Sequence, residues 1–425
     1  MIVRPLFRYY FPMQDMPSTT DTCRVCQRPF TVEELSTSNF VRMRDKYAHP
    51  LCYAPYVDET NLKILANCRC WSIGDTLTMT PAIRELRRLY PKAEIGVISN
   101  FPELFKYNPH VDKNFDRKEV LPSVLKPQFT RIIDLFTGDF QQHWATHSVD
   151  FCAKSGLGKS LLPKDMQLEL SYSEADRRSL MDTIKIENND KLILVHPHKT
   201  EWDTRNWGAS RMPDLVRKLK AAYPSHRILS IGGSRFTEEH SKHMKNYVDL
   251  PEAENLYGRL SLLETAALMD LPQTKLLVTP DTGTLHLAAT RPELPIVGIF
   301  TLIKSHFRAP YRRGSPNYKF YPVEINECSC TYDGKAFIEY TDLSTCPKGN
   351  FLITTLQSEL SPEEKLVGLK QRFPETAWKP EELEEQIAAE TQKYRSGDLR
   401  CFPEVQKVFD ACKQALDDKR SWKLW

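Results

Sequence analysis

A short polar turn after an apolar segment carries the first side chains able to bind an anion. Residues 275–279 have the apolar pattern of a buried strand, Pro280 ends it, and residues 284–290 have the pattern of a helix. The polar residues at this turn are Asp281, Thr282, Gly283, Thr284 and His286. Open α/β sheets bind ligands at such strand ends, where free N–H groups at a helix start attract anions. The turn is a candidate ligand site, and a structural turn with Asp281 as the N-cap is the alternative.

An earlier segment repeats this arrangement with an acid next to a glycine. Residues 62–70 have the pattern of a strand, and Gly74 and Asp75 are expected to form the turn that follows it. The apolar residues that recur after this turn at helical spacing are Met79, Ile83, Leu86 and Tyr90. Residues 93–99 are the next strand candidate. The sequence therefore predicts a complete strand–helix–strand unit with a carboxylate at its mouth.

Basic and glycine residues follow further strand candidates. The loop after strand 192–195 contains Lys199, Thr200 and Arg205, which suit a pyrophosphate, although a solvated basic loop is the alternative. Gly233 follows strand 227–231, where the backbone could approach a nucleotide. A basic stretch could also reach a ligand, or could be a solvated loop; its residues are Lys304, His306, Arg308, Arg312 and Arg313.

Two groups of cysteines have the spacing of metal ligands. The N-terminal group has two close pairs of ligands, Cys23, Cys26, His49 and Cys52. Closed sets of sulfur and imidazole ligands are typical of structural zinc, and four incidental residues in a small reduced domain are the alternative. The C-terminal group offers a less complete metal site: Cys328, Cys330 and Cys346 supply three ligands, and Cys401 is a candidate for the fourth.

These residues must be positioned by two α/β domains. We expect an N-terminal metal-binding module over residues 1–56, a first Rossmann-like domain over 57–185 and a second over 186–325. Residues 326–425 are expected to form a helical, cysteine-containing tail. The fold class predicted for the centre of the chain is thus α/β, with two Rossmann-like units.

Three segments resemble the heptosyltransferases, glycosyltransferase family 9. The first resembles their N-terminal signature and comprises Gly74-Asp75, Thr80-Pro81-Ala82-Ile83 and Leu89-Tyr90-Pro91. The second, Leu192 to Pro197 with Arg205-Asn206-Trp207, resembles the opening of their second domain. The third resembles their C-terminal signature and comprises Asp281-Thr282-Gly283 and His286-Leu287-Ala288-Ala289. The resemblance covers residues 62–300 and leaves both flanks uncovered.

The resemblance implies a GT-B fold, in which the two domains face each other across a nucleotide-sugar site. It implies that Asp75 is the general base of an inverting transfer, that ADP-heptose is the donor and that no divalent metal is required. Some protein-modifying relatives bind iron through C-terminal cysteines. The acceptor is left open: a glycan, a protein or a nucleic acid. A catalytically inactive GT-B scaffold is the alternative, and an epimerase would need an acid and base pair that we cannot locate.

The composition indicates a soluble globular protein. The 425 residues are 41% hydrophobic and 27% charged, with a mean hydropathy of −0.47. The net charge of +3 is too small to indicate a polyanion as partner. No apolar run is long enough for a membrane helix, and the N-terminus lacks the apolar core of a signal peptide. We therefore expect a cytoplasmic protein, in which the eleven cysteines favour metal binding over disulfides. The sequence does not indicate an oligomeric state.

Overall fold

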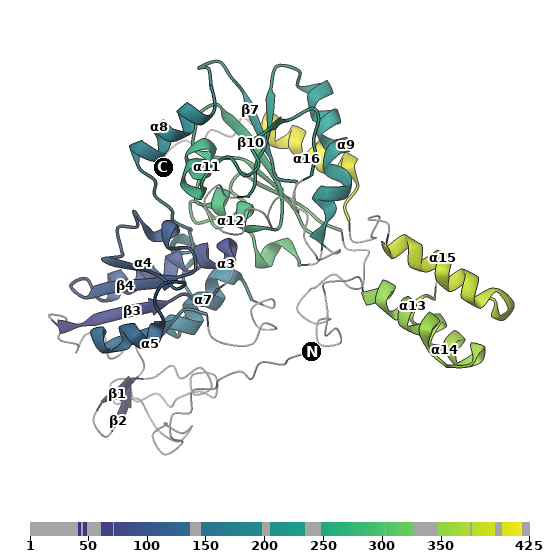
Figure 1. Ribbon diagram of the computed structural model, residues 1–425, viewed down its shortest axis with the longest axis horizontal. Coiled ribbons are helices and arrows are strands. Elements are labelled where there is room, and N and C mark those ends of the chain that lie inside the picture. The colour runs from purple at the N-terminus through teal and green to yellow at the C-terminus, as the bar shows by residue number, and fades with distance from the viewer. Residues whose placement is uncertain are drawn as a thin grey trace.

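Two parallel β-sheets with flanking helices form the body of the protein (Figure 1). The computed structural model describes residues 41–43, 46–48, 61–70, 72–136, 146–197, 205–233, 248–301, 303–325, 347–374, 376–395 and 402–418. The α/β class with parallel sheets, predicted from the alternation of apolar runs and helical patterns, is confirmed.

The first sheet has four strands in the order β5-β4-β3-β6, and all neighbouring strands are parallel. Its strands are β3 (Lys63–Asn67), β4 (Glu94–Ser99), β5 (Lys113–Asp116) and β6 (Arg131–Asp134). The elements between them are α3 (Ile73–Leu77), α4 (Thr80–Leu89), η4 (Pro102–Phe105), α5 (Pro122–Leu125) and η5 (Lys126–Gln128). Helix α7 (Ser148–Leu157) follows β6 and packs on α4. The predicted helical face of α4 is buried, as its apolar spacing requires.

The segment that connects the two domains contains η6 (Pro163–Asp165) and α8 (Glu174–Thr183). A capping box begins α8: the Ser173 side chain accepts from the N–H of Asp176, whose carboxylate accepts from the N–H of Ser173. Arg84 of α4 donates to Glu169 in the connection at 2.6 Å. Arg291 of the second domain donates to the backbone carbonyl of Leu170. The connection is therefore tied to both domains.

The second sheet has six parallel strands in the order β12-β11-β10-β7-β8-β9. The strands are β7 (Leu192–Val195), β8 (Arg227–Ser230), β9 (Glu254–Asn255), β10 (Thr274–Pro280), β11 (Ile296–Ile299) and β12 (Phe320–Val323). The helical elements between them are α9 (Trp207–Ala222), α11 (Leu262–Met269), α12 (Gly283–Ala289) and η8 (Ser305–Phe307). Strands β7 and β11 are fully buried, and β10 is buried except at Lys275, because helices cover both faces.

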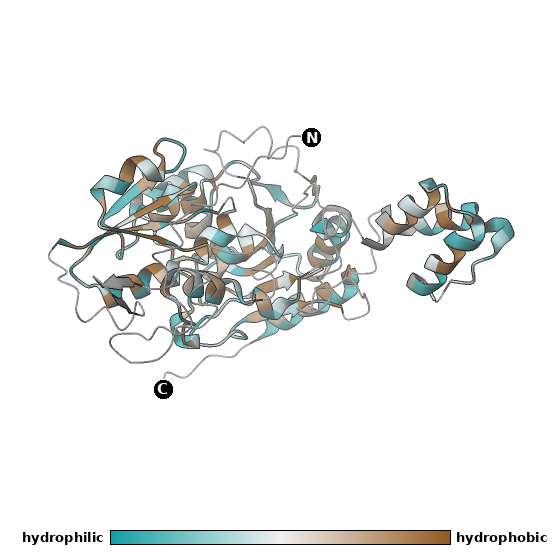
Figure 2. Ribbon diagram, turned by 90° about the horizontal axis from the view of Figure 1, so that it is seen from below, coloured by the Kyte–Doolittle hydropathy of each residue, from teal (hydrophilic) through white to brown (hydrophobic). Residues whose placement is uncertain are grey.

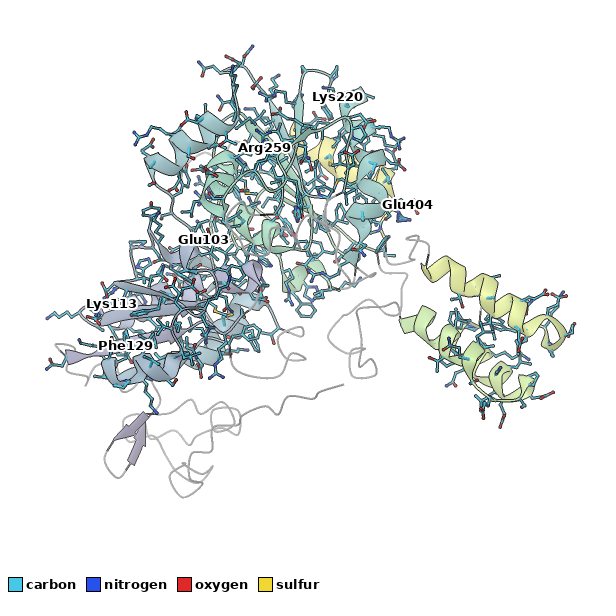
Figure 3. The ribbon with its side chains drawn as sticks, in the orientation of Figure 1. Glu103, Lys113, Phe129, Lys220, Arg259 and Glu404 are labelled. Atoms are coloured by element: carbon cyan, nitrogen blue, oxygen red, sulfur yellow. The ribbon has the colours of Figure 1, made fainter. Side chains whose placement is uncertain are left out.

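Alternate side chains of β7 show how the two faces of this sheet are filled. Leu192 and Leu194 belong to a core with α11, α12 and the first domain, whereas Ile193 and Val195 belong to a core with α9 and α16 (Val405–Asp417). Trp207, the first residue of α9, is buried and donates from its indole to the carbonyl of Pro403 at 2.6 Å. Figure 3 accordingly shows Glu404, at the start of α16, beside the second domain. The last described helix of the predicted tail thus packs on the second sheet.

Three helices of the C-terminal region pack mainly on one another. They are α13 (Pro347–Gln357), α14 (Pro362–Arg372) and α15 (Leu383–Arg395), with η10 (Pro380–Glu382) between the last two. Figures 1 and 2 both show this unit standing apart from the two sheets. The helical character predicted for residues 326–425 is confirmed for α14, α15 and α16.

The described part of the N-terminal region is an antiparallel hairpin of β1 (Val41–Met43) and β2 (Lys46–Ala48). Of the helices within the described ranges, none combines the length and the apolar composition that crossing a membrane requires.

Candidate active site at the domain junction

Asp75 is held in a fixed orientation by its own helix cap. Ser72 caps α3: its hydroxyl oxygen accepts from the N–H of Asp75 at 3.0 Å and donates to the Asp75 carboxylate at 2.8 Å. Gly74 and Asp75 were expected to form a turn, but they lie in the first turn of this helix. The expectation was wrong because Ser72, and not the glycine, marks the change from strand to helix. The carboxylate is partly buried at the mouth of the first sheet.

Three buried thiols lie behind this carboxylate. Cys68, Cys70 and Cys152 are buried and unpaired, and Asp75 is among the charges that act on Cys70 and Cys152. Burial raises the pKa of Cys68 and Cys70, and it raises the pKa of Cys152 to about 12. The thiols are therefore neutral near pH 7.

The polar turn of the second domain connects β10 to α12. Thr282, rather than Asp281, is the N-cap residue of α12, so the alternative role considered for Asp281 is wrong. Thr282 is buried, and its hydroxyl lies 3.3 Å from that of Thr279. Arg205 reaches this turn: its Nη2 lies 3.7 Å from the Asp281 carboxylate and donates to the Asp281 carbonyl. The structure thus joins two predicted site residues that are 76 positions apart.

The two turns are in direct contact across the domain junction. A Cβ atom added to Gly74 would lie 2.7 Å from His286 Cδ2 and 3.4 Å from the Cα of Gly283. A Cβ added to Gly283 would lie 3.2 Å from the Cβ of Ile73. Glycine is required at position 74 because the buried ring of His286 occupies the space of a side chain. His286, predicted to bind the nucleotide, here packs against the first domain.

Gly233 lies at a second strand end of the same sheet. Gly232 and Gly233 have φ values of +141° and +62°, which favour glycine, and they turn the chain after β8. The ring of His196 packs against Gly232, and its Nδ1–H donates to the Ile231 carbonyl at 2.9 Å. Burial lowers the pKa of His196 to about 4, so this ring is neutral. The two glycines let the chain pass closely over His196 and Tyr257.

The predicted basic stretch after β11 divides into residues with different roles. Arg312 is fully buried and donates to backbone carbonyls, including those of Tyr318 at 2.5 Å and Lys319 at 2.6 Å, so it is structural. Arg313 is exposed and pairs with Glu293. Arg308 is buried at the junction, where Asp281 and Asp75 are the charges that oppose the lowering of its pKa by burial. Of these three, Arg308 is the one for which charges of both turns, Asp75 and Asp281, favour the charged form.

His147 at the junction was not identified from the sequence. Its Nε2–H donates to the carbonyl of Ala309 at 2.9 Å, and its ring packs edge-on against Tyr311. Burial lowers the pKa of His147 to about 4. Nothing in the local sequence marks this residue, because its partners lie 162 and 164 positions away and meet it only in the folded chain.

Several predicted site residues lie outside the described residues. They are Lys199 and Thr200 of the basic loop and the proposed metal ligands Cys23, Cys26, His49, Cys52, Cys328, Cys330, Cys346 and Cys401. Within the described ranges, no group of three or more histidine, cysteine, aspartate or glutamate residues could hold a metal ion.

Comparison with known proteins gives one family match. Residues 141–328 match glycosyltransferase family 9 (heptosyltransferase). No curated protein sequence matches the chain significantly.

The chain is also similar to solved structures of glycosyltransferases, at low identity and with TM-scores below 0.5. E. coli ADP-heptose LPS heptosyltransferase II is 17% identical, with a TM-score of 0.48, over 65% of this chain and 95% of that one. The iron-containing dodecameric glycosyltransferase TibC from enterotoxigenic E. coli is 13% identical, with a TM-score of 0.46, over 79% and 78% of the two chains. E. coli heptosyltransferase WaaC with ADP is 17% identical, with a TM-score of 0.39, over 62% and 93%. The match with the family supports a glycosyltransferase.

Proposed function

We propose that this chain is an inverting glycosyltransferase that transfers a heptose from ADP-heptose to a hydroxyl group of a macromolecule. The observation that best supports this proposal is the contact of Gly74 with Gly283 and His286. This contact brings the helix that carries Asp75 in the first domain next to the turn proposed to bind the diphosphate in the second domain. The family match supports the reaction class, and the donor is inferred from the resemblance of the sequence motifs. The acceptor would be a glycan, a protein or a nucleic acid.

In the proposed reaction, Asp75 accepts the proton of the acceptor hydroxyl. The acceptor oxygen forms a bond to the anomeric carbon, from the face opposite the diphosphate, and the configuration inverts. The bond from the anomeric carbon to the diphosphate breaks, and its electron pair stays on the diphosphate oxygen. Ser72 supports this role, because its hydrogen bonds fix the carboxylate before substrate binds.

The donor diphosphate would be held on the side of the second domain. Arg205 beside Asp281 is the predicted cation that lies at the turn, and Thr282, Gly283 and Thr284 offer N–H and hydroxyl donors. Lys199, Thr200 and Gly233 are proposed to complete this site. A cation and several donors suit a diphosphate because hydrogen bonds between charged groups are stronger than neutral ones.

A thermal-shift screen of the purified chain against nucleotides and nucleotide sugars tests the proposal. ADP-heptose and ADP should raise Tm more than the UDP and GDP series, because a ligand that binds only the folded state stabilises it. A failure of every nucleotide to raise Tm would refute the proposed function. Binding of ADP-heptose without its consumption, across candidate acceptors, would favour the inactive scaffold instead.

We also propose a structural zinc ion in the N-terminal region. The candidate ligands are Cys23, Cys26, His49 and Cys52. Support comes from their spacing and from the β1–β2 hairpin, which ends one residue before His49. Elemental analysis should show one equivalent of zinc lost in Cys26→Ser, with nucleotide binding intact. Unchanged metal content in this variant would rule the site out.

A second metal, iron or zinc, is proposed at the C-terminal cysteines. The candidate ligands are Cys328, Cys330, Cys346 and Cys401. Elemental analysis of Cys330→Ser tests it. This variant should lose one equivalent of metal but keep the zinc that Cys26→Ser loses, which would show that the two sites are distinct. If Cys330→Ser keeps the full metal content of the wild type, there is no second site.

A further inference from the structure

Arg308 is a buried cation at the place where the two domains meet. It follows η8, in the segment after β11, and its side chain is 5% exposed. Asp281 of the second domain and Asp75 of the first are the two leading charges that favour its charged form, and Arg205 opposes them. Arg308 therefore lies among the residues on which the proposed reaction depends.

The hydrogen bonds of Arg308 leave most of its guanidinium unused. Its Nη1 donates to the carbonyl of Phe307 at 2.9 Å. Within the described part of the chain it makes no ion pair, and no hydrogen bond is donated by its Nε or Nη2. A guanidinium carries five N–H donors and stays charged in proteins. A buried charge so poorly paired is unfavourable, unless an anion completes its partners.

The other buried arginines of the same domain show what a structural role looks like. Arg312 donates to five backbone carbonyls, those of Arg291, Pro292, Leu294, Tyr318 and Lys319. Arg291 donates to Thr290, Asp270 and Leu170. Both side chains are used to tie segments of the fold together. Arg308 is as buried as Arg291, yet its Nη1 donates only to the carbonyl of the adjacent residue, Phe307.

The segment that carries Arg308 is fastened to the first domain. His147, directly before α7, donates to the carbonyl of Ala309 and packs against Tyr311. Ala309 is buried in the core shared by the two domains. The segment of the cation is thus held at the junction by a contact with the domain that carries Asp75, and not only by its connection to β11.

We propose that Arg308 is a further catalytic residue, which donates hydrogen bonds to the donor diphosphate and stabilises the charge that this group gains when the glycosidic bond breaks. The inference rests on the proposed function. As the acceptor oxygen bonds to the anomeric carbon, the bonding pair of the breaking bond moves to the diphosphate oxygen, and Asp75 holds the proton released. The leaving nucleoside diphosphate gains one negative charge, next to which Arg308 supplies a fixed positive charge. His147 is a positioning residue for it.

Binding of nucleoside diphosphates tests this proposal without the acceptor. The affinities of ADP, UDP and GDP are compared with those of AMP, UMP and GMP by calorimetry, in the wild type, Arg308→Gln and Arg308→Lys. Arg308→Gln should weaken the tightest diphosphate by about 10–100-fold, the loss expected for one hydrogen bond between charged groups. Affinity for the matching monophosphate should change less than threefold. Arg308→Lys should bind the diphosphate with intermediate affinity, because lysine keeps the charge but not the fork of donors.

Arg313→Gln is the matched control, since it removes an arginine five positions away that lies on the surface. It should leave both affinities unchanged. His147→Gln, which can still donate to Ala309, should retain more diphosphate affinity than His147→Ala. Equal loss in these two variants would overturn the positioning role.

Two failures can be told apart. If the wild type binds a diphosphate and folded Arg308→Gln keeps the same preference over the monophosphate, the role of Arg308 is wrong and the proposed function stands. If the wild type binds no nucleotide, the proposed function fails and this inference falls with it.

Discussion

The two sides of the domain junction differ in charge and in how their charged groups are held. On the first side, Asp75 is oriented by the hydroxyl of Ser72 within one short helix. On the second side, Arg205 and Arg308 come from separate segments: Arg205 pairs with Asp281, and Asp281 is the leading charge that favours the charged form of Arg308. A single oriented carboxylate suits proton transfer, whereas several cations suit a charged donor. In the proposed function, the first domain activates the acceptor and the second binds the donor.

The largest effect is expected from Asp75→Asn. If Asp75 takes part in the chemical step but not in donor binding, turnover of the donor should fall by roughly 10²–10⁴-fold, while nucleotide affinity changes less than about threefold. Turnover and calorimetric affinity measured on the same preparation check both parts. Asp182→Asn, which removes an exposed carboxylate from α8, is the control and should keep full turnover. Equal losses of affinity and turnover in Asp75→Asn would mean that Asp75 also takes part in donor binding, and would contradict the separate roles proposed for the two sides.

The free energy of unfolding is expected to depend on pH through His196 of the second domain. The pKa of His196 is lowered from 6.5 to about 4, so the unfolded state binds the proton more readily than the folded state. Stability from this residue is full above pH 6.5 and is lost as pH falls toward 4, by about 3 kcal/mol at most. Denaturant unfolding across this range should show a shallower slope with pH in His196→Gln. His306→Gln, which removes an exposed ring, should keep the slope of the wild type.

The contact between the two sides can be broken by Gly74→Ala. The new Cβ would lie 2.7 Å from His286, so one of the two elements must move, at a cost of about 1–3 kcal/mol. Chemical unfolding measures that cost, and turnover should fall because Asp75 moves with α3. Gly368→Ala adds a methyl group 3.2 Å from Phe351 in the separate helical unit. This control should leave turnover unchanged. If Gly74→Ala keeps the turnover and the stability of the wild type, the contact between the two domains at this position is not needed for either.

The smallest effect is expected from Arg313→Gln. Its ion pair with Glu293 is on the surface, and Lys319 also pairs with Glu293 at 2.9 Å. The free energy of unfolding should fall by less than about 1 kcal/mol. A larger loss, measured by urea unfolding, would show that this arginine is structural and would disqualify it as a control for Arg308.

The elements predicted from the sequence are those whose burial shows locally. Strands β7 and β11 and residues 276–278 of β10 are continuous apolar runs because helices cover both faces of their sheet. Strands β5 and β9 were missed, because Lys113–Asp116 is polar and half exposed and Glu254–Asn255 is two exposed residues long. Their place in the sheets depends on pairing with a neighbouring strand, which periodicity does not reveal.

The same limit applies to the candidate site. Asp75 and the Asp281–Thr284 turn could be found because each follows a recognisable strand at its carboxyl end. The contact of the two turns, the bond from His147 to Ala309 and the placement of Arg308 depend on how distant segments pack. In the sequence, Arg308 is one of several basic residues, and only its burial separates it from Arg313.

The most direct test of the central claim is a crystal structure with ADP bound. We predict the diphosphate at the junction, with its oxygens within about 3.2 Å of donors from Arg308 and from the turn Asp281–Thr284. The carboxylate of Asp75 should face the terminal phosphate across the space left for the sugar and the acceptor. A diphosphate bound away from these residues would contradict the account, whatever activity the protein shows.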